Sequence, residues 1–210
     1  MNPCNIPSVP IIEEEKWRLQ HKIHITKANS SDPDVLLIGA SIIEFIQYHP
    51  IWKEKFIPLN SVNFGIAGDC TQNVLWRVKN GILDNIKPKV CILNVGSNNL
   101  ENLPEDVVSG ILAIVYEIKL KIPKCFIIII GILPRGPRPN NLREIGTQIN
   151  TILSQNIKSI SQVELFIPNL LQEDGILSEK DAPDFLHPSE SGYQKIFNPI
   201  LPRVSAILNN

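Results

Sequence analysis

The sequence predicts an α/β protein, a three-layer α/β/α sandwich around a central, mostly parallel sheet of five strands. Two observations carry this prediction. From Asp34 onward, short apolar runs alternate with longer amphipathic segments, an order typical of a doubly wound sheet. Three of the apolar runs are almost unbroken in branched or large apolar residues, as expected of strands that are covered on both faces.

The five predicted strands are the runs 35–38, 62–64, 90–95, 126–130 and 163–167. The predicted helices span 42–48, 71–80, 104–121, 142–159 and 189–208. Pro104 followed by two acidic residues is a good helix start, because proline suits the first turn and acids suit the positive end of the helix dipole. Pro199 and Pro202 should kink or break the last helix.

The length of 210 residues suits one domain with a substantial core. We expect residues 1–30 to form an N-terminal arm, with one helical piece around 13–24, and residues 31–210 to form the domain. The longest apolar run, 125–133, is far shorter than the ~20 residues of a spanning helix. The N-terminus has no basic segment followed by an apolar one, so we expect no signal peptide.

Composition and charge exclude several classes of partner and cofactor. A net charge of −1 gives no electrostatic case for nucleic acid or for an anionic membrane surface. The four cysteines show no C-x-x-C spacing, which argues against zinc and suits a reduced, cytoplasmic protein. No nucleotide-binding glycine motif is present. His21 and His24 share a helical face, and an exposed helix in the arm explains them better than a metal. We therefore expect no cofactor and no metal.

Two distant motifs suggest nucleophilic catalysis. Gly39-Ala40-Ser41 follows the first predicted strand, and Asp184-Phe185-Leu186-His187 lies near the C-terminus. Ser41, His187 and Asp184 can form a triad in which the imidazole takes the hydroxyl proton and the carboxylate holds the ring in the right tautomer. Each also has a plainer interpretation: Ser41 as a helix N-cap, His187 as an ordinary surface or hydrogen-bonded loop residue, and Asp184 as a turn former. The G-x-S-x-G motif of the common α/β-hydrolases is absent.

Gly68 and Asn98 complete the candidate site. A glycine after a strand is most often a turn residue, and Asn98 could be only a cap. In the functional interpretation, the Gly68 N–H, the Asn98 side-chain amide and the Ser41 N–H surround a developing oxyanion, and losing one such donor costs ~3 kcal/mol. The segments 39–41, 65–69, 96–99 and 131–136 all follow predicted strands. They should therefore gather at the carboxyl edge of the sheet, where ligands of such folds bind.

These blocks resemble the SGNH (GDSL) hydrolase superfamily, which has a flavodoxin-like fold and whose four blocks contribute Ser, Gly, Asn and His. Within it the chain looks similar to the catalytic alpha subunits of intracellular platelet-activating-factor acetylhydrolase of type Ib. The resemblance runs from about residue 17 to the end of the chain. It is carried by the segments 33–36, 59–66, 74–81, 85–90, 96–99, 133–136 and 184–187.

The resemblance implies a role for each position. Ser41 would be the nucleophile, Asp184 and His187 the rest of the triad, and Gly68 and Asn98 the oxyanion donors with the Ser41 N–H. Three further residues align with the family's small acyl pocket: Ile42, Ser97 and Leu186. The family cleaves the acetyl ester of platelet-activating factor without a metal, and its alpha subunits dimerise and associate with a WD-repeat regulatory protein of the lissencephaly type.

One departure from the family separates two hypotheses. The family motif is Gly-Asp-Ser, but here Ala40 precedes the serine. An aspartate there can accept backbone N–H bonds and stiffen the turn, whereas alanine leaves the turn dependent on packing. The first hypothesis is a serine esterase for a short acyl group, on platelet-activating-factor-like phospholipids or on other short acyl esters. The alternative is a catalytically weak member that acts as a dimeric partner of a WD-repeat protein.

Overall fold

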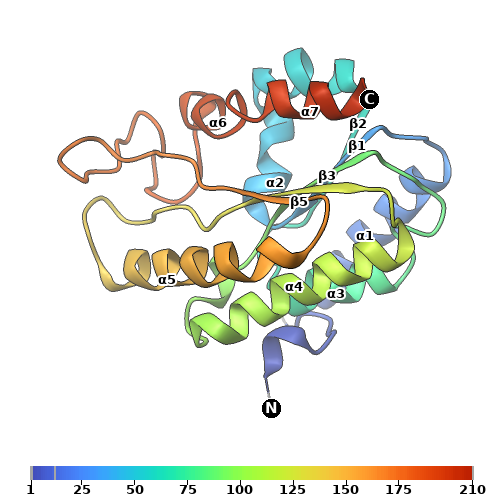
Figure 1. Ribbon diagram of the computed structural model, residues 1–210, viewed down its shortest axis with the longest axis horizontal. Helices are drawn as coiled ribbons and strands as arrows, with labels where there is room; N and C mark the ends of the chain where they lie inside the picture. The colour runs from blue at the N-terminus through green and yellow to red at the C-terminus, as the bar shows by residue number, and fades with distance from the viewer. Residues whose placement is uncertain (1, 12, 210) are drawn as a thin grey trace.

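The computed structural model describes residues 2–11 and 13–209 and confirms the predicted α/β/α sandwich (Figure 1). Its five strands pair in the order β2-β1-β3-β4-β5, and every pairing is parallel. The strands are β1 (Val35–Gly39), β2 (Ser61–Gly65), β3 (Val90–Asn94), β4 (Phe126–Ile130) and β5 (Val163–Phe166). Each lies within two residues at either end of its predicted range, the usual uncertainty of element boundaries.

Helices cover both faces of the sheet (Figure 1). One layer holds α1 (Glu14–Asn29), α3 (Thr71–Lys79), α4 (Pro104–Lys121) and α5 (Asn141–Asn156). The other holds α2 (Ser41–Phe45), α6 (Glu190–Phe197) and α7 (Leu201–Leu208). In the part of the chain that the structure describes, no helix combines the length and the apolar character that crossing a membrane requires.

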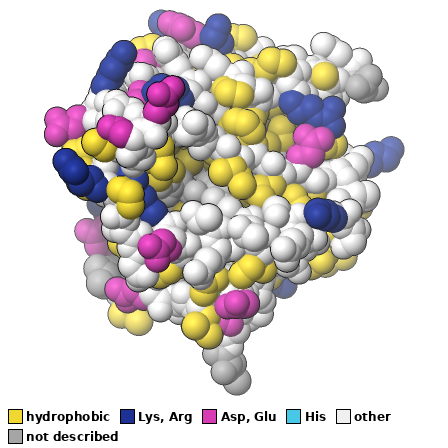
Figure 2. Space-filling view, turned by 60° about the vertical axis from the view of Figure 1, so that its left-hand side comes forward, with side chains coloured by type: hydrophobic (Ala, Val, Ile, Leu, Met, Phe, Trp, Pro, Cys, Tyr) yellow, Lys and Arg dark blue, Asp and Glu magenta, His cyan; other side chains and the backbone are white. Residues whose placement is uncertain are grey.

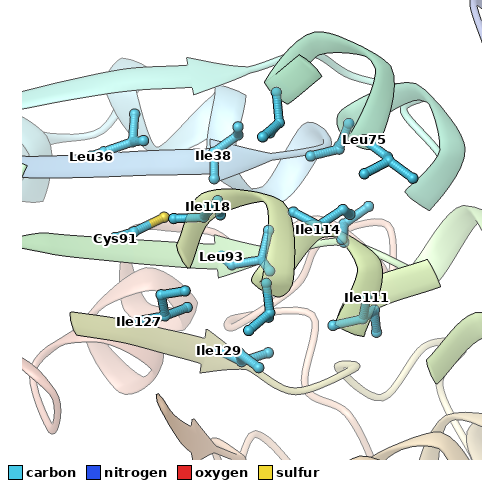
Figure 3. Packing of buried hydrophobic residues seen from close by; sticks show 14 of the residues in the cluster. Leu36, Ile38, Leu75, Cys91, Leu93, Ile111, Ile114, Ile118, Ile127 and Ile129 are labelled. Atoms are coloured by element: carbon cyan, nitrogen blue, oxygen red, sulfur yellow. The ribbon is translucent and has the colours of Figure 1, made fainter. Parts of the chain in front are cut away.

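The core consists of two hydrophobic clusters, one on each face of the sheet. Successive strand residues point to opposite faces, so Leu36 and Ile38 of β1 enter one cluster while Val35 and Leu37 enter the other. Figure 3 shows the first cluster, in which residues of β1, β3 and β4 meet the buried side of α4. The strands are therefore apolar throughout, as the sequence predicts.

The last helix is broken as its prolines predict. Two helices replace the single range 189–208: α6 ends at Phe197, and α7 begins at Leu201 with Pro202 in its first turn. The range 42–48 is also divided, because α2 is followed by a 3₁₀ turn, Ile46–Tyr48. The short helical turns Trp52–Phe56 and Ile57–Leu59, which precede β2, were not predicted.

The N-terminal helix is longer and more buried than expected. α1 extends five residues beyond the predicted end at residue 24. His21 and His24 are both only 4% exposed, and the His24 ring stacks on Phe64 of β2. The explanation of these histidines by an exposed helix is therefore wrong, because the face of α1 that carries them packs on the domain. The expected boundary near residue 30 falls between α1 and β1, and the division into arm and domain stays a prediction.

The buried histidines of α1 predict a pH-dependent stability. Burial lowers the pKa of His21 to about 4 and that of His24 to about 2, from an ordinary 6.5. As the pH falls below 6.5, the unfolded chain takes up protons that the folded chain does not, so the free energy of unfolding should fall between about pH 6.5 and 4. His24→Leu should remove about one proton, or about 1.4 kcal/mol per pH unit, from this slope. Denaturant titrations at several pH values measure it, and an unchanged slope in His24→Leu would contradict the assignment.

Candidate functional site

The direction in which the chain winds across the sheet reverses between β1 and β3. The chain leaves β1 for β2 on one side and β3 for β4 on the other, and ligands of doubly wound sheets bind at such a switch point, beyond the carboxyl ends of the strands. Ser41 follows β1, and the 3₁₀ turn Ser97–Asn99 follows β3. A Cβ at Gly39 would lie 1.9 Å from the carbonyl oxygen of Asn94, so a glycine is required where β1 and β3 end side by side.

The loops that follow β4 and β5 lie together on the left of Figure 1. Figure 2 turns this side of the molecule toward the viewer. Hydrophobic side chains gather near the middle of the face, and many of the charged ones lie towards its left margin. The surface at this side of the molecule is thus largely uncharged at its centre.

Ser41, His187 and Asp184, which are far apart in sequence, form one hydrogen-bonded chain. The His187 Nδ1 atom lies 2.6 Å from Asp184 Oδ2, and His187 Nε2 lies 3.1 Å from Ser41 Oγ. An ionised carboxylate only accepts hydrogen bonds, so the proton of the neutral ring belongs on Nδ1. Nε2 is then an acceptor for the Ser41 hydroxyl. This is the polarity that proton abstraction from the serine requires.

Asp184 is both a turn former and the partner of the ring. Its Oδ1 atom accepts the backbone N–H groups of Leu186 at 3.0 Å and His187 at 2.7 Å. Burial raises the pKa of this carboxyl, but the hydrogen bonds from His187 and Leu186 outweigh burial and hold the pKa below its ordinary value. The two interpretations of Asp184 offered by the sequence are therefore compatible.

Contacts outside the D-x-x-H motif hold its loop in place. Phe185 has a left-handed backbone with φ of 57°, and its carbonyl accepts the N–H of Gly136 at 2.8 Å. Asp181 is only 2% exposed, and its carboxylate binds Lys195 of α6. The Tyr193 hydroxyl of α6 donates to the Ile42 carbonyl at 2.9 Å. The helix after His187 is thereby tied to the helix that begins at Ser41.

Gly68 and Asn98 lie on the loops that follow β2 and β3, and both are exposed. Gly68 has a positive φ of 84°, which glycine adopts without strain. The Asn98 side-chain amide donates to the Asp69 carbonyl at 3.0 Å. This bond links the two loops and fixes the amide with one N–H still to spare.

A buried ion pair behind these loops was not predicted from the sequence. Arg77 of α3 is fully buried, and its guanidinium binds the Asp69 carboxylate at 2.6 and 2.8 Å. Trp17 of α1 donates its indole N–H to the other carboxylate oxygen at 2.6 Å. Burial raises the pKa of Asp69, and the charge of Arg77 and the two donors counteract that rise.

The same guanidinium also reaches the candidate nucleophile turn. Arg77 donates to the carbonyl oxygens of Phe64 at 2.7 Å and Gly39 at 3.1 Å, at the ends of β2 and β1. The sequence suggested that the turn containing Ala40 depends on packing alone. The contact from Arg77 shows that a hydrogen bond holds it as well, at the Gly39 carbonyl next to Ala40.

The three expected acyl-pocket residues lie on three different segments around Ser41. Ile42 is buried next to Ser41 on α2, whereas Ser97 and Leu186 are half-buried. The Ser97 carbonyl accepts from Arg135 at 3.3 Å, which joins the loops after β3 and β4. Their contact with an acyl group stays a prediction.

Potential metal ligands are not clustered in the part of the chain that the structure describes. Within residues 2–11 and 13–209, no three or more His, Cys, Asp or Glu side chains are grouped so that they could bind a metal ion. The chemistry that the described groups can perform is activation of the Ser41 hydroxyl by His187.

Solved structures of low sequence identity share the fold. A GDSL-like lipase from Bacteroides thetaiotaomicron matches with a TM-score of 0.75 at 18% identity, over 89% of this chain and 97% of that one. A carbohydrate esterase of family 3 from Talaromyces cellulolyticus matches with a TM-score of 0.61 at 17% identity, over 84% and 98% of the two chains. The chain thus shares the overall fold of these two structures.

The chain belongs to the GDSL-like lipase/acylhydrolase family, whose profile matches residues 46–195. It is 42% identical to the alpha2 subunit of platelet-activating factor acetylhydrolase IB of Homo sapiens. This alignment of 203 residues covers 95% of this chain and 89% of the relative. It is 39% identical over 213 residues to the beta subunit homolog of Drosophila melanogaster, with 100% and 95% covered. The resemblance inferred from the motifs is confirmed, and it supports an acylhydrolase activity.

Proposed function

We propose that the protein is a serine esterase that removes a short acyl group, such as acetyl, from platelet-activating-factor-like phospholipids or related esters. The observation that carries the proposal is the hydrogen-bonded chain from Asp184 through His187 to Ser41 at the switch point of the sheet. In this mechanism Ser41 attacks the ester carbonyl as His187 takes its proton, and His187 then protonates the departing alcohol. An acyl-enzyme forms on Ser41. His187 then takes a proton from the water that attacks the acyl group, and it returns this proton to the Ser41 oxygen as the acid is released.

The oxyanion in this proposal is bound by the backbone N–H groups of Ser41 and Gly68 and by the Asn98 side chain. The bond from Asn98 to the Asp69 carbonyl supports the role because it orients the amide before substrate arrives. Preorganised donors of this kind supply much of the stabilisation of acyl-transfer transition states. No metal or cofactor is needed for these steps.

We propose further that the protein is a cytoplasmic homodimer and binds a WD-repeat regulatory protein of the lissencephaly type. The proposal is supported by the names of two relatives described above, both of which are subunits of platelet-activating factor acetylhydrolase IB. Light scattering at micromolar concentration tests the dimer, which requires a mass near twice the 23.6 kDa of the chain.

The second candidate function is that of a catalytically weak family member acting as such a partner. Ala40 favours it, because the family aspartate is absent. The contact from Arg77 to the Gly39 carbonyl favours the esterase, because it supplies polar support to the same turn. Turnover by the purified protein separates the two.

Acyl chain length tests the esterase proposal directly. With p-nitrophenyl acetate, butyrate and octanoate as substrates, we expect kcat/KM to fall at least tenfold from acetate to octanoate. The reason is that a long chain would have to displace packed side chains near Ile42, and a pocket discriminates by about 1–3 kcal/mol for a misfitted methylene group. Equal or faster hydrolysis of octanoate would indicate a lipase or thioesterase instead, and no hydrolysis of any ester would favour the weak member.

A further inference from the structure

A groove of about 780 Å³ lies beside the candidate site, within the size range of small-molecule sites. Part of the lining comes from the N-terminal side, with Val9 and Pro10 of the segment before α1 and Trp17 of α1, and part from the loop after β2, with Ile66 and Gly68. Phe45 and Glu44 of α2 also line it. The groove belongs neither to the hydrogen-bonded chain nor to the expected acyl pocket.

The groove is continuous with the reacting groups. Gly68, a candidate oxyanion donor, is part of its lining. The ring of Phe45, also in the lining, packs on the ring of His187 with centroids 5.1 Å apart. His187 has to protonate the departing alcohol oxygen. The alcohol therefore leaves close to Phe45, which contacts His187 and lines the groove. The three expected acyl-pocket residues do not line the groove, which fits a position on the alcohol side of the ester.

The N-terminal wall is fixed by contacts to the body of the protein. The Ser8 N–H donates to the Gln72 carbonyl at 3.2 Å, and the Ser8 carbonyl accepts from the Asn73 side chain at 3.0 Å. The indole N–H of Trp17 binds Asp69 at 2.6 Å. The wall is therefore present before any ligand binds, which reduces the ordering that binding would require.

The charges along the groove select its ligand. The carboxylate of Asp69 is paired with Arg77 and accepts a hydrogen bond from Trp17. The carboxylate of Glu13 is paired with Lys16, with Nζ and Oε2 3.4 Å apart. Glu44 remains, with one oxygen accepting the Ala67 N–H at 2.5 Å. An anionic ligand would meet this carboxylate, whereas an apolar one would contact Val9, Pro10, Phe45 and Ile66. Placing a negative charge beside another in a partly desolvated site is unfavourable.

We propose that this groove binds the alcohol part of the ester and that it favours alcohols with an apolar body and no negative charge. The proposal rests on the esterase function proposed above. It assigns substrate selection to the segment that precedes α1, in particular to Val9.

Three acetate esters test the groove in turnover. We expect kcat/KM for 4-butylphenyl acetate to exceed that for phenyl acetate about tenfold or more, since the leaving groups differ mainly in apolar surface. The anionic 4-acetoxybenzenesulfonate should be the slowest, although its leaving group is the better one. Val9→Asp should remove most of the butyl preference. Leu120→Asp is the matched control, because Leu120 is exposed on α4 away from the groove, and it should keep the preference.

A binding measurement separates failure of the groove from failure of the esterase. Calorimetry on Ser41→Ala should show 4-butylphenol binding about tenfold or more tightly than phenol, and Val9→Asp in that background should abolish the difference. Equal binding of the two phenols, or a preference untouched by Val9→Asp, would overturn the groove proposal whether or not the protein is an esterase. Ester hydrolysis that persists in Ser41→Ala would overturn the proposed function and leave the binding result to decide on the groove.

Discussion

Replacing Ser41 with alanine should lower kcat for acetate esters by about four to six orders of magnitude and leave KM within a few-fold. The size follows from what loss of the nucleophile costs in serine hydrolases, where oxyanion donors and binding alone retain only a small residual rate. A fluorophosphonate probe should label the unaltered protein at Ser41 and should not label Ser41→Ala. Steady-state kinetics and mass spectrometry of the labelled peptide measure the two effects.

A double variant tests whether Ser41 and His187 act as one unit or contribute to kcat independently. The kcat of Ser41→Ala/His187→Ala should lie within a few-fold of that of Ser41→Ala, because the imidazole has no serine proton to take once the hydroxyl is gone. Ser205→Ala on α7 is the control serine and should retain full activity, because the hydrogen-bonded chain consists of Ser41, His187 and Asp184 and does not include Ser205. Full esterase activity in Ser41→Ala would refute the assignment of the nucleophile.

The parts of the fold that the sequence predicted are those fixed by local pattern. β4 is an unbroken run of Phe and Ile, so both its position and its burial on two faces follow from composition. Pro104 marks the start of α4 and Pro202 the start of α7, because proline is tolerated in a first turn and not further along. The short turns before β2 have no such periodicity, and they were not predicted.

The site was predictable only in part, for a similar reason. Ser41 and the D-x-x-H motif stand at strand and helix ends, where the order of elements already brings them to one edge of the sheet. The contact of Trp17 with Asp69 joins residues 52 positions apart, and nothing in either neighbourhood signals it. The burial of His21 and His24 depends on the same packing of α1, so the arm was wrongly expected to expose them. Tertiary packing outweighs local polarity in each case.

The second large effect is expected at the buried ion pair. Arg77→Gln should lower the free energy of unfolding by about 3–5 kcal/mol, because it leaves the Asp69 carboxylate buried without its cation. Asp69→Asn should cost a similar amount for the converse reason. Arg18→Gln is the matched control: its pair with Glu14 is 44% and 46% exposed, so the change should be about 1 kcal/mol or less. Denaturant unfolding of each variant measures these differences.

The double variant Asp69→Asn/Arg77→Gln should be more stable than the sum of the single losses predicts, since it leaves no unpaired buried charge and the two amides can hydrogen-bond.

The activity of this double variant is the more informative result. The geometry around Asn98 and Gly39 depends on the ion pair through the Asp69 carbonyl and the Arg77 guanidinium. We therefore expect kcat in the double variant to stay about tenfold or more below that of the unaltered protein, with KM little changed, because loosened donors weaken binding of the transition state more than binding of the substrate. If restored stability brings back full kcat, the ion pair supports the fold alone. A persistent loss of kcat in a stable protein assigns the ion pair a positioning role for the oxyanion donors, in a chain that has Ala40 in place of the family's aspartate beside the nucleophile.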